Sequence, residues 1–116
     1  MRSDDIAVTV DHRGDGVVVV HPAGRLDLLY AAELRQRLAD LVAAGESRLV
    51  VNLARVISID SAGLGALFSG LKAARRAGGD LRIASPPDQA LVILELTMLR
   101  DVLRTYPTEA EALHGF

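Results

Sequence analysis

The chain has 116 residues, 50% of them hydrophobic but only 3% aromatic, and it contains no cysteine. This length suits one domain, which we place at residues 1–116, and the lack of cysteine excludes disulfides, thiolate metal sites and a cysteine nucleophile. The 13 basic and 15 acidic residues are spread along the chain and give a net charge of −2, so no basic stripe points to nucleic acid as a partner.

Hydrophobic periodicity predicts secondary structure in the order β-β-α-β-α-β-α-β-α. Alternating apolar residues or short β-branched runs indicate strands, and apolar stripes with a period near 3.6 residues indicate helices. In chain order the defining residues are Ile6–Val10 and Val17–Val20 (strands), Ala31–Val42 (helix), Leu49–Leu53 (strand), Leu64–Ala74 (helix), Leu81–Ile83 (strand), Leu91–Met98 (helix), Val102–Leu103 (edge strand) and Thr108–Leu113 (helix).

Turn and cap residues separate these elements. Turn residues at Gly14–Gly16 favour a hairpin between the first two strands, and an extended stretch through Ile57 and Ile59 precedes the second helix. Thr108 and Glu111 have the spacing of a capping box at the last helix. Strands that alternate with helices favour a largely parallel sheet with right-handed crossovers. We therefore expect the α/β class: a single domain with a mixed, mostly parallel sheet of about 4–5 strands and about 4 helices.

Sequence signatures of catalysis are incomplete throughout the chain. The segment Gly65–Lys72 resembles a phosphate loop, but Leu71 stands where that loop requires lysine. Phe68 replaces the third glycine of a dinucleotide fingerprint, and Ile59 replaces the glycine that a nucleophile elbow needs before Ser61. The histidines share no metal-ligand spacing. We expect no enzyme activity, no metal site and no cofactor.

Features of a membrane or exported protein are also missing. No apolar run approaches the roughly 20 residues that a membrane span needs. The residues Met1–Asp5 lack the apolar segment of a signal peptide. We therefore expect a cytoplasmic protein without direct membrane insertion.

The most informative stretch is Asp60–Gly65, which joins a predicted strand to an amphipathic helix. Asp60 or Ser61 falls at the helix N-cap, and local physics alone favours a structural interpretation in which two glycines allow close packing of helix on sheet. In a functional interpretation, a serine at a helix start has an accessible hydroxyl. Phosphorylation would add about −1.5 to −2 charges there, and free helix N–H groups could partly accommodate them. Such a site suits a switch on binding.

At this stretch the sequence resembles the STAS domain, specifically bacterial anti-sigma factor antagonists. The sequence D-S-A-G-L-G at Asp60–Gly65 is similar to that family's phosphorylation motif. Further similarity follows in order along nearly the whole chain, at Gly24–Asp27, Val50–Leu53, Gly78–Leu81 and Thr108–Leu113. Two departures stand out. Ala62 replaces a second hydroxyl residue that is frequent in the family, and Thr97–Leu99 stands where many relatives have a Gly-Leu pair.

The resemblance implies a partner-switching regulator of sigma-factor-dependent transcription. Unphosphorylated, it would bind an anti-sigma factor that is also a serine kinase; phosphorylation of Ser61 by that kinase would release it, and a serine phosphatase would reset the system. ATP would belong to the kinase. The resemblance also implies a partner-binding surface at Asp27, Leu28, Asp60, Ser61, Ala62, Gly63, Leu64 and Gly65.

Two other functions stay open at this stage. A STAS-type accessory subunit of a membrane transporter, such as a lipid-transport ATPase, would bind its partner stably and without phosphorylation. An enzyme or nucleotide-binding protein is disfavoured, because no complete acid–base, nucleophile or phosphate-loop constellation is present.

Overall fold

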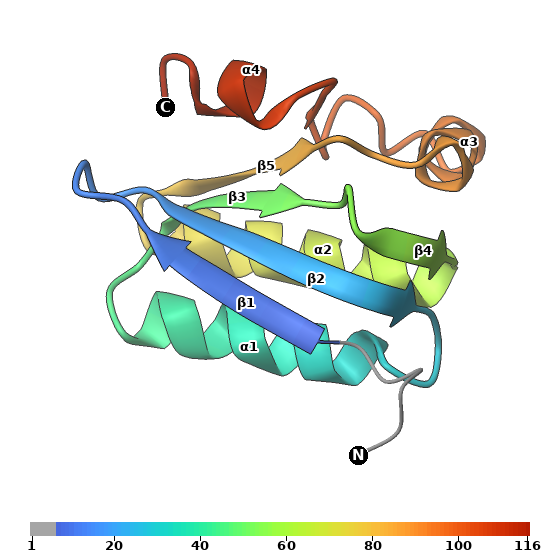
Figure 1. Ribbon diagram of the computed structural model, residues 1–116, viewed down its shortest axis with the longest axis horizontal. Coiled ribbons are helices and arrows are strands. Elements are labelled where there is room, and N and C mark those ends of the chain that lie inside the picture. Colours follow the sequence, from blue (N-terminus) through green and yellow to red (C-terminus); the bar gives the residue numbers. More distant parts are fainter. Residues whose placement is uncertain (1–6) are drawn as a thin grey trace.

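A mixed six-stranded sheet, with two long helices on one face, organises residues 7–116, the part of the chain that this computed structural model describes (Figure 1). In chain order the elements are β1 (Ala7–His12), β2 (Val18–Leu26), α1 (Ala31–Ala43), β3 (Arg48–Asn52), β4 (Val56–Ile59), α2 (Ser61–Arg76), β5 (Asp80–Ala84), α3 (Asp88–Leu96), β6 (Thr105–Tyr106) and α4 (Glu109–Leu113). The expected α/β class, with a mostly parallel sheet and four helices, is confirmed. Met1–Asp5 and Ile6, the predicted start of the first strand, lie outside the described residues.

The sheet has the strand order β1-β2-β3-β5-β6, with β1 antiparallel to β2 and the remaining pairs parallel. The strand β2 is its organising element, because Val18–Val20 pair with β3 and Gly24–Leu26 pair with β4. β2 is therefore longer than the predicted Val17–Val20. Residues 21–23 pair with β1 alone, so the missing N–H of Pro22 costs no bond to β3 or β4.

The main core lies between the sheet and the pair α1 and α2 (Figure 1). Leu34 and Leu38 of α1 meet Leu67 and Leu71 of α2 in one buried cluster, as the predicted helical stripes require. The two helices lie close together because α2 has a glycine at their contact. A Cβ atom at Gly70 would stand 2.6 Å from the Leu38 Cδ1 atom.

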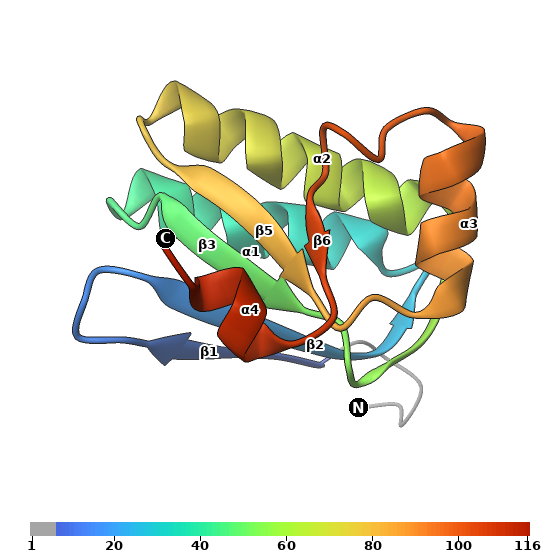
Figure 2. The same cartoon turned by 90° about the horizontal axis from the view of Figure 1, so that it is seen from above.

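The opposite face of the sheet is covered by α4, which lies over β3 and β5 (Figure 2). A second, smaller core joins Val17 and Val19 to Ala112 of α4. The Arg82 Nη1 group donates hydrogen bonds to the carbonyl oxygens of Ala112 and His114 at 3.0 and 2.9 Å. Since Val17–Val20 are all at most 1% exposed, the prediction of a strand covered on both faces is confirmed.

Two predictions for the C-terminal third were wrong. Val102 and Leu103 form a turn, and the edge strand β6 follows at Thr105–Tyr106, where it pairs with Ile83 and Ala84. Leu103 is fully buried, so its apolar character reflects its place in the core and does not indicate a strand. The third helix was predicted to include Met98, but α3 ends at Leu96.

The turn after α3 adopts the hydrogen bonding of a Schellman motif. The Met98 N–H donates to the Glu95 carbonyl at 3.3 Å, and the Leu99 N–H donates to the Leu94 carbonyl at 3.1 Å. Met98 adopts a φ of +59° and is 87% exposed. Met98 therefore occupies the left-handed position that favours glycine.

Candidate functional site

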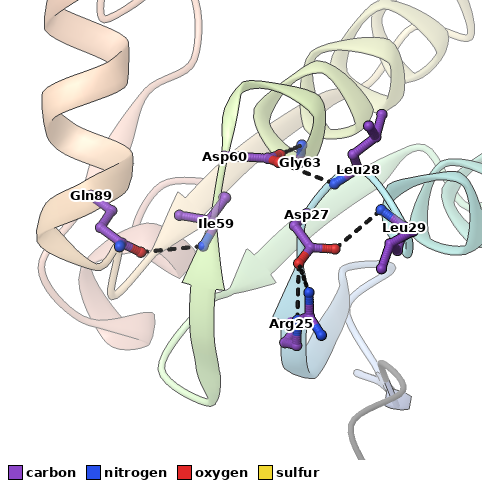
Figure 3. A network of polar contacts seen from close by, with 8 residues as sticks. All are labelled: Arg25, Asp27, Leu28, Leu29, Ile59, Asp60, Gly63 and Gln89. Carbon is purple, nitrogen blue, oxygen red and sulfur yellow. Dashed lines mark hydrogen bonds and ion pairs between the residues drawn. The ribbon is translucent and has the colours of Figure 1, made fainter.

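The N-terminus of α2 is held in place by a single carboxylate. Asp60 follows β4 and is the N-cap of α2, where its Oδ1 atom accepts a hydrogen bond from the Gly63 N–H at 3.0 Å. Its Oδ2 atom accepts from the Leu28 N–H at 3.1 Å (Figure 3). The Asp60 side chain thus satisfies one free amide of the helix and also ties α2 to the loop between β2 and α1. Of the two N-cap candidates, the structure assigns the cap to Asp60.

Ser61 is the first residue of α2, and it is exposed. Its hydroxyl makes no hydrogen bond with any residue between 7 and 116, and the cap of the helix is supplied by Asp60. Ser61 therefore lies at a fixed place on the surface, and its hydroxyl makes no contact that stabilises the described fold. A hydroxyl of this kind can be modified without breaking a contact that holds the fold.

The two glycines of the motif have different environments. A Cβ atom at Gly63 would stand 2.1 Å from the Leu26 carbonyl oxygen and 2.9 Å from the Leu26 Cγ atom. Gly63 therefore allows α2 to approach β2. The same atom built at Gly65 meets nothing within 4 Å. The expectation that both glycines serve helix–sheet packing is right for Gly63 and wrong for Gly65.

The remaining motif residues divide into interior and surface positions. Leu64 is 3% exposed and packs in the main core, and Gly63 is also buried. Ala62 and Gly65 are half-buried on the outer side of α2. Gly63 and Leu64 thus shape the helix start from within, whereas Ser61, Ala62 and Gly65 present atoms to solvent.

The loop between β2 and α1 is ordered by Asp27. The Arg25 Nε and Nη2 atoms donate to the Asp27 Oδ2 atom at 2.9 and 2.7 Å, and the Leu29 N–H donates to Oδ1 at 3.1 Å (Figure 3). The Asp27 carbonyl accepts from the Tyr30 and Ala31 N–H groups at the start of α1. This bonding leaves Leu28 and Leu29 77% and 70% exposed.

Leu29 was missed by sequence reasoning, which selected only Asp27 and Leu28 in this loop. Two adjacent leucines directly after a polar turn residue are the signal that could have found it. The bond from the Leu28 N–H to the Asp60 carboxylate brings this loop beside the start of α2, as expected for Asp27 and Leu28. The structure thus places the loop and the Asp60–Gly65 motif side by side (Figure 3).

The described residues show neither a metal centre nor a membrane span. Within residues 7–116, no three histidine, cysteine, aspartate or glutamate side chains form a group that could hold a metal ion. No helix in that range is long and apolar enough to cross a membrane. His21 lies 3.7 Å from the Glu109 carboxylate, which also accepts a bond from Asn52 at 3.0 Å. These groups help to hold α4 against the sheet.

Comparison with known proteins identifies the family. The chain matches the STAS domain over residues 9–112. A protein of Thermotoga maritima that carries a provisional name as an anti-sigma factor antagonist is 30% identical over 100 residues, which span 85% of this chain and 88% of that protein. The anti-sigma-B factor antagonist of Bacillus subtilis is 29% identical over 86 residues, which span 74% of this chain and 78% of that protein.

The fold comparison agrees with the sequence comparison. The crystal structure of an anti-sigma factor antagonist from Mycobacterium paratuberculosis matches with a TM-score of 0.83 and 28% identity, and the match covers 97% of this chain and 94% of that chain. The family match spans nearly all of the described fold and includes the Asp60–Gly65 motif. The chain therefore belongs to the STAS domain family, and the relatives to which it is similar are named anti-sigma factor antagonists.

Proposed function

We propose that this protein is an anti-sigma factor antagonist that changes partners through phosphorylation of Ser61. Unphosphorylated, it binds an anti-sigma factor that is also a serine kinase and so frees a sigma factor in the cytoplasm. Phosphorylation of Ser61 releases the kinase, and a serine phosphatase restores the binding form. The observation that carries this proposal is that Ser61 is exposed at the start of α2 while Asp60 alone supplies the cap.

The geometry accounts for a switch that leaves the fold intact. A phosphate on Ser61 would lie at a helix N-terminus, where free N–H groups and the helix dipole favour negative charge. The same phosphate would place about −1.5 to −2 charges beside the Asp60 carboxylate. The helix start tolerates this charge, but a partner surface fitted to a neutral serine does not, because it would have to desolvate two adjacent anions.

The outer side of α2 supports close contact with a partner. Gly65 costs helix stability relative to alanine, roughly 1 kcal/mol, and no internal contact requires its small size. Gly65 lies one turn after the proposed phosphoacceptor, and no contact within the protein explains why this residue is glycine. A glycine is expected at such a position where another protein approaches the helix backbone. Leu28 from the neighbouring loop adds an exposed apolar side chain to the same surface.

The role of binding protein, rather than enzyme, fits the chemistry of the site. Its groups are the Ser61 hydroxyl, the capping Asp60 carboxylate, the Asp27 carboxylate paired with Arg25, and small or apolar side chains, and no general base contacts Ser61 among the described residues. The kinase therefore supplies both ATP and the catalytic groups. The antagonist supplies the acceptor and the surface that positions it.

The direct test is phosphorylation by the cognate kinase. With ATP, intact-mass measurement should show one added phosphate, and the Ser61→Ala variant should show none. Ser69→Ala, on the same side of α2 two turns later, is the matched control and should still accept one phosphate. Phosphate on any other residue would contradict the proposal. So would stable co-purification with a transporter ATPase that is indifferent to Ser61.

The binding side of the switch is tested with the Ser61→Asp variant. Its affinity for the kinase should fall by about tenfold or more, because a carboxylate beside Asp60 imitates part of the phosphate charge. Its thermal unfolding should match that of the wild type. Equal affinities of the two proteins would refute the charge mechanism.

A further inference from the structure

The exposed large hydrophobic side chains of the described residues gather at one end of the molecule. They lie on three segments that surround the start of α2: the β2–α1 loop, β4 and α3 with the turn after it (Figures 1 and 3). These residues are Leu28, Leu29, Ile57, Val92, Leu96 and Met98, and their exposed fractions range from 56% to 87%. Such a concentration of exposed apolar surface marks an interaction site more often than a random scatter would.

The α3 part of this surface is continuous with the Ser61 motif. The Gln89 Oε1 atom accepts a hydrogen bond from the Ile59 N–H at 3.3 Å, which fixes one side of α3 against the end of β4. Val92 and Leu96 follow Gln89 at the i+3 and i+7 positions, so they lie on the same side of the helix. The first turn of α3, which carries Gln89, therefore lies beside the end of β4, and Leu28 and Leu29 lie on the other side of Asp60 (Figure 3).

The surroundings of the stripe indicate what it can bind. Leu91, Val92, Glu95, Leu96 and Arg100 line a shallow, open surface hollow of about 340 Å³. The charges at its edge are paired with each other, because the Arg100 Nη1 atom lies 3.1 Å from the Glu95 carboxylate. Because its exposed charges pair with each other and most of its lining is apolar, this hollow suits uncharged apolar side chains.

The usual size of a protein interface favours the kinase as the partner that covers the stripe. A specific interface buries about 800 Å² on each partner, which corresponds to a disc about 16 Å in radius. The Cα trace extends over only 34 × 32 × 24 Å. An interface of this size centred on the Ser61 hydroxyl would reach the segments beside the start of α2. Those segments carry the apolar residues.

We propose that the anti-sigma factor kinase that acts on Ser61 also binds the apolar stripe of α3, Val92 and Leu96, through uncharged apolar side chains of its own. This inference rests on the proposed function and divides the interface into two parts. The stripe provides affinity in either phosphorylation state. The start of α2 provides the part of the affinity that phosphorylation removes.

The test uses the double variant Val92→Gln/Leu96→Gln with the cognate kinase. Both side chains are exposed and glutamine is a good helix former, so α3 should remain folded, which thermal unfolding checks. The variant should bind the kinase about tenfold or more weakly. It should lose affinity by a similar factor in the Ser61→Asp background. In the phosphorylation assay KM should rise while kcat changes little, because the stripe contacts no reacting group.

Arg76→Gln at the far end of α2 is the control and should leave the affinity and KM unchanged. If the double variant binds and is phosphorylated like the wild type, the stripe is not part of the interface, and this inference fails while the proposed function stands. If the wild type is not phosphorylated on Ser61, the proposed function fails first. If the protein alone sediments as a dimer and the double variant as a monomer, a second copy covers the stripe, which also overturns the inference.

Discussion

Replacing Gly65 with alanine should stabilise the protein and weaken its partner binding. The residue lies in the second turn of α2, where glycine costs conformational entropy on folding. A Cβ atom built there meets nothing within 4 Å, so the added methyl group strains no internal contact. The substitution therefore separates the effect of Gly65 on the stability of the fold from its effect on partner binding.

The expected gain in the free energy of unfolding is about 1 kcal/mol, the difference between glycine and alanine inside a helix. With an unfolding entropy of roughly 2.1 cal/mol/K per residue, this gain raises Tm by about 4 °C for a chain of this length. Affinity for the kinase should fall by about tenfold or more, because the methyl group occupies space that the partner backbone would fill.

Differential scanning calorimetry and titration of the kinase measure the two effects on the same samples. Gly63→Ala is the matched control, because its Cβ atom would stand 2.1 Å from the Leu26 carbonyl oxygen and must displace α2 or β2. That control should lose about 1–3 kcal/mol of stability or more. A lower Tm for Gly65→Ala would refute the packing argument, and unchanged affinity would remove Gly65 from the interface.

Two further predictions concern stability alone. Asp60→Ala removes the acceptor of two backbone N–H groups and should lower the free energy of unfolding, measured with urea, by about 2 kcal/mol. Hydrogen exchange at the Leu28 and Gly63 amides should become faster. Slow exchange at both amides would show that another group caps α2. Met98→Gly should raise the free energy of unfolding by about 0.5–1 kcal/mol, because φ at this exposed position is +59°. Val92→Gly, in the helix before it, should instead destabilise, and an equal effect of the two glycines would contradict the left-handed assignment.

Strong periodicity was enough to predict the elements that build the core. The stripes that contain Leu34 and Leu38, and Leu67 and Leu71, are buried as helical periodicity requires. Burial alone does not reveal backbone pairing, however. Leu103 is as fully buried as any strand residue, yet it lies in a turn, because an apolar side chain can fill the core from irregular backbone.

Long-range contacts determine what local patterns could not predict. The second half of β2 could not be predicted as a strand, since His21–Gly24 are not a run of apolar residues. Its extended conformation comes from pairing with β1 and then with β4. The same limit applies within the motif. Gly63 and Gly65 look alike in sequence, and only the position of the Leu26 carbonyl oxygen distinguishes the packing glycine from the other.

The division of labour between Asp60 and Ser61 is what makes a switch compatible with this fold. If the serine hydroxyl capped α2, its modification would remove a helix contact, and release of a partner would be coupled to local unfolding. With both carboxylate oxygens of Asp60 engaged by backbone amides, Ser61 can gain or lose a phosphate while the helix start keeps its bonds. In the proposed switch, the same carboxylate is the fixed negative charge beside which the phosphate would be added. In this proposal the stability of the helix start depends on Asp60, whereas the chemistry of modification depends on Ser61.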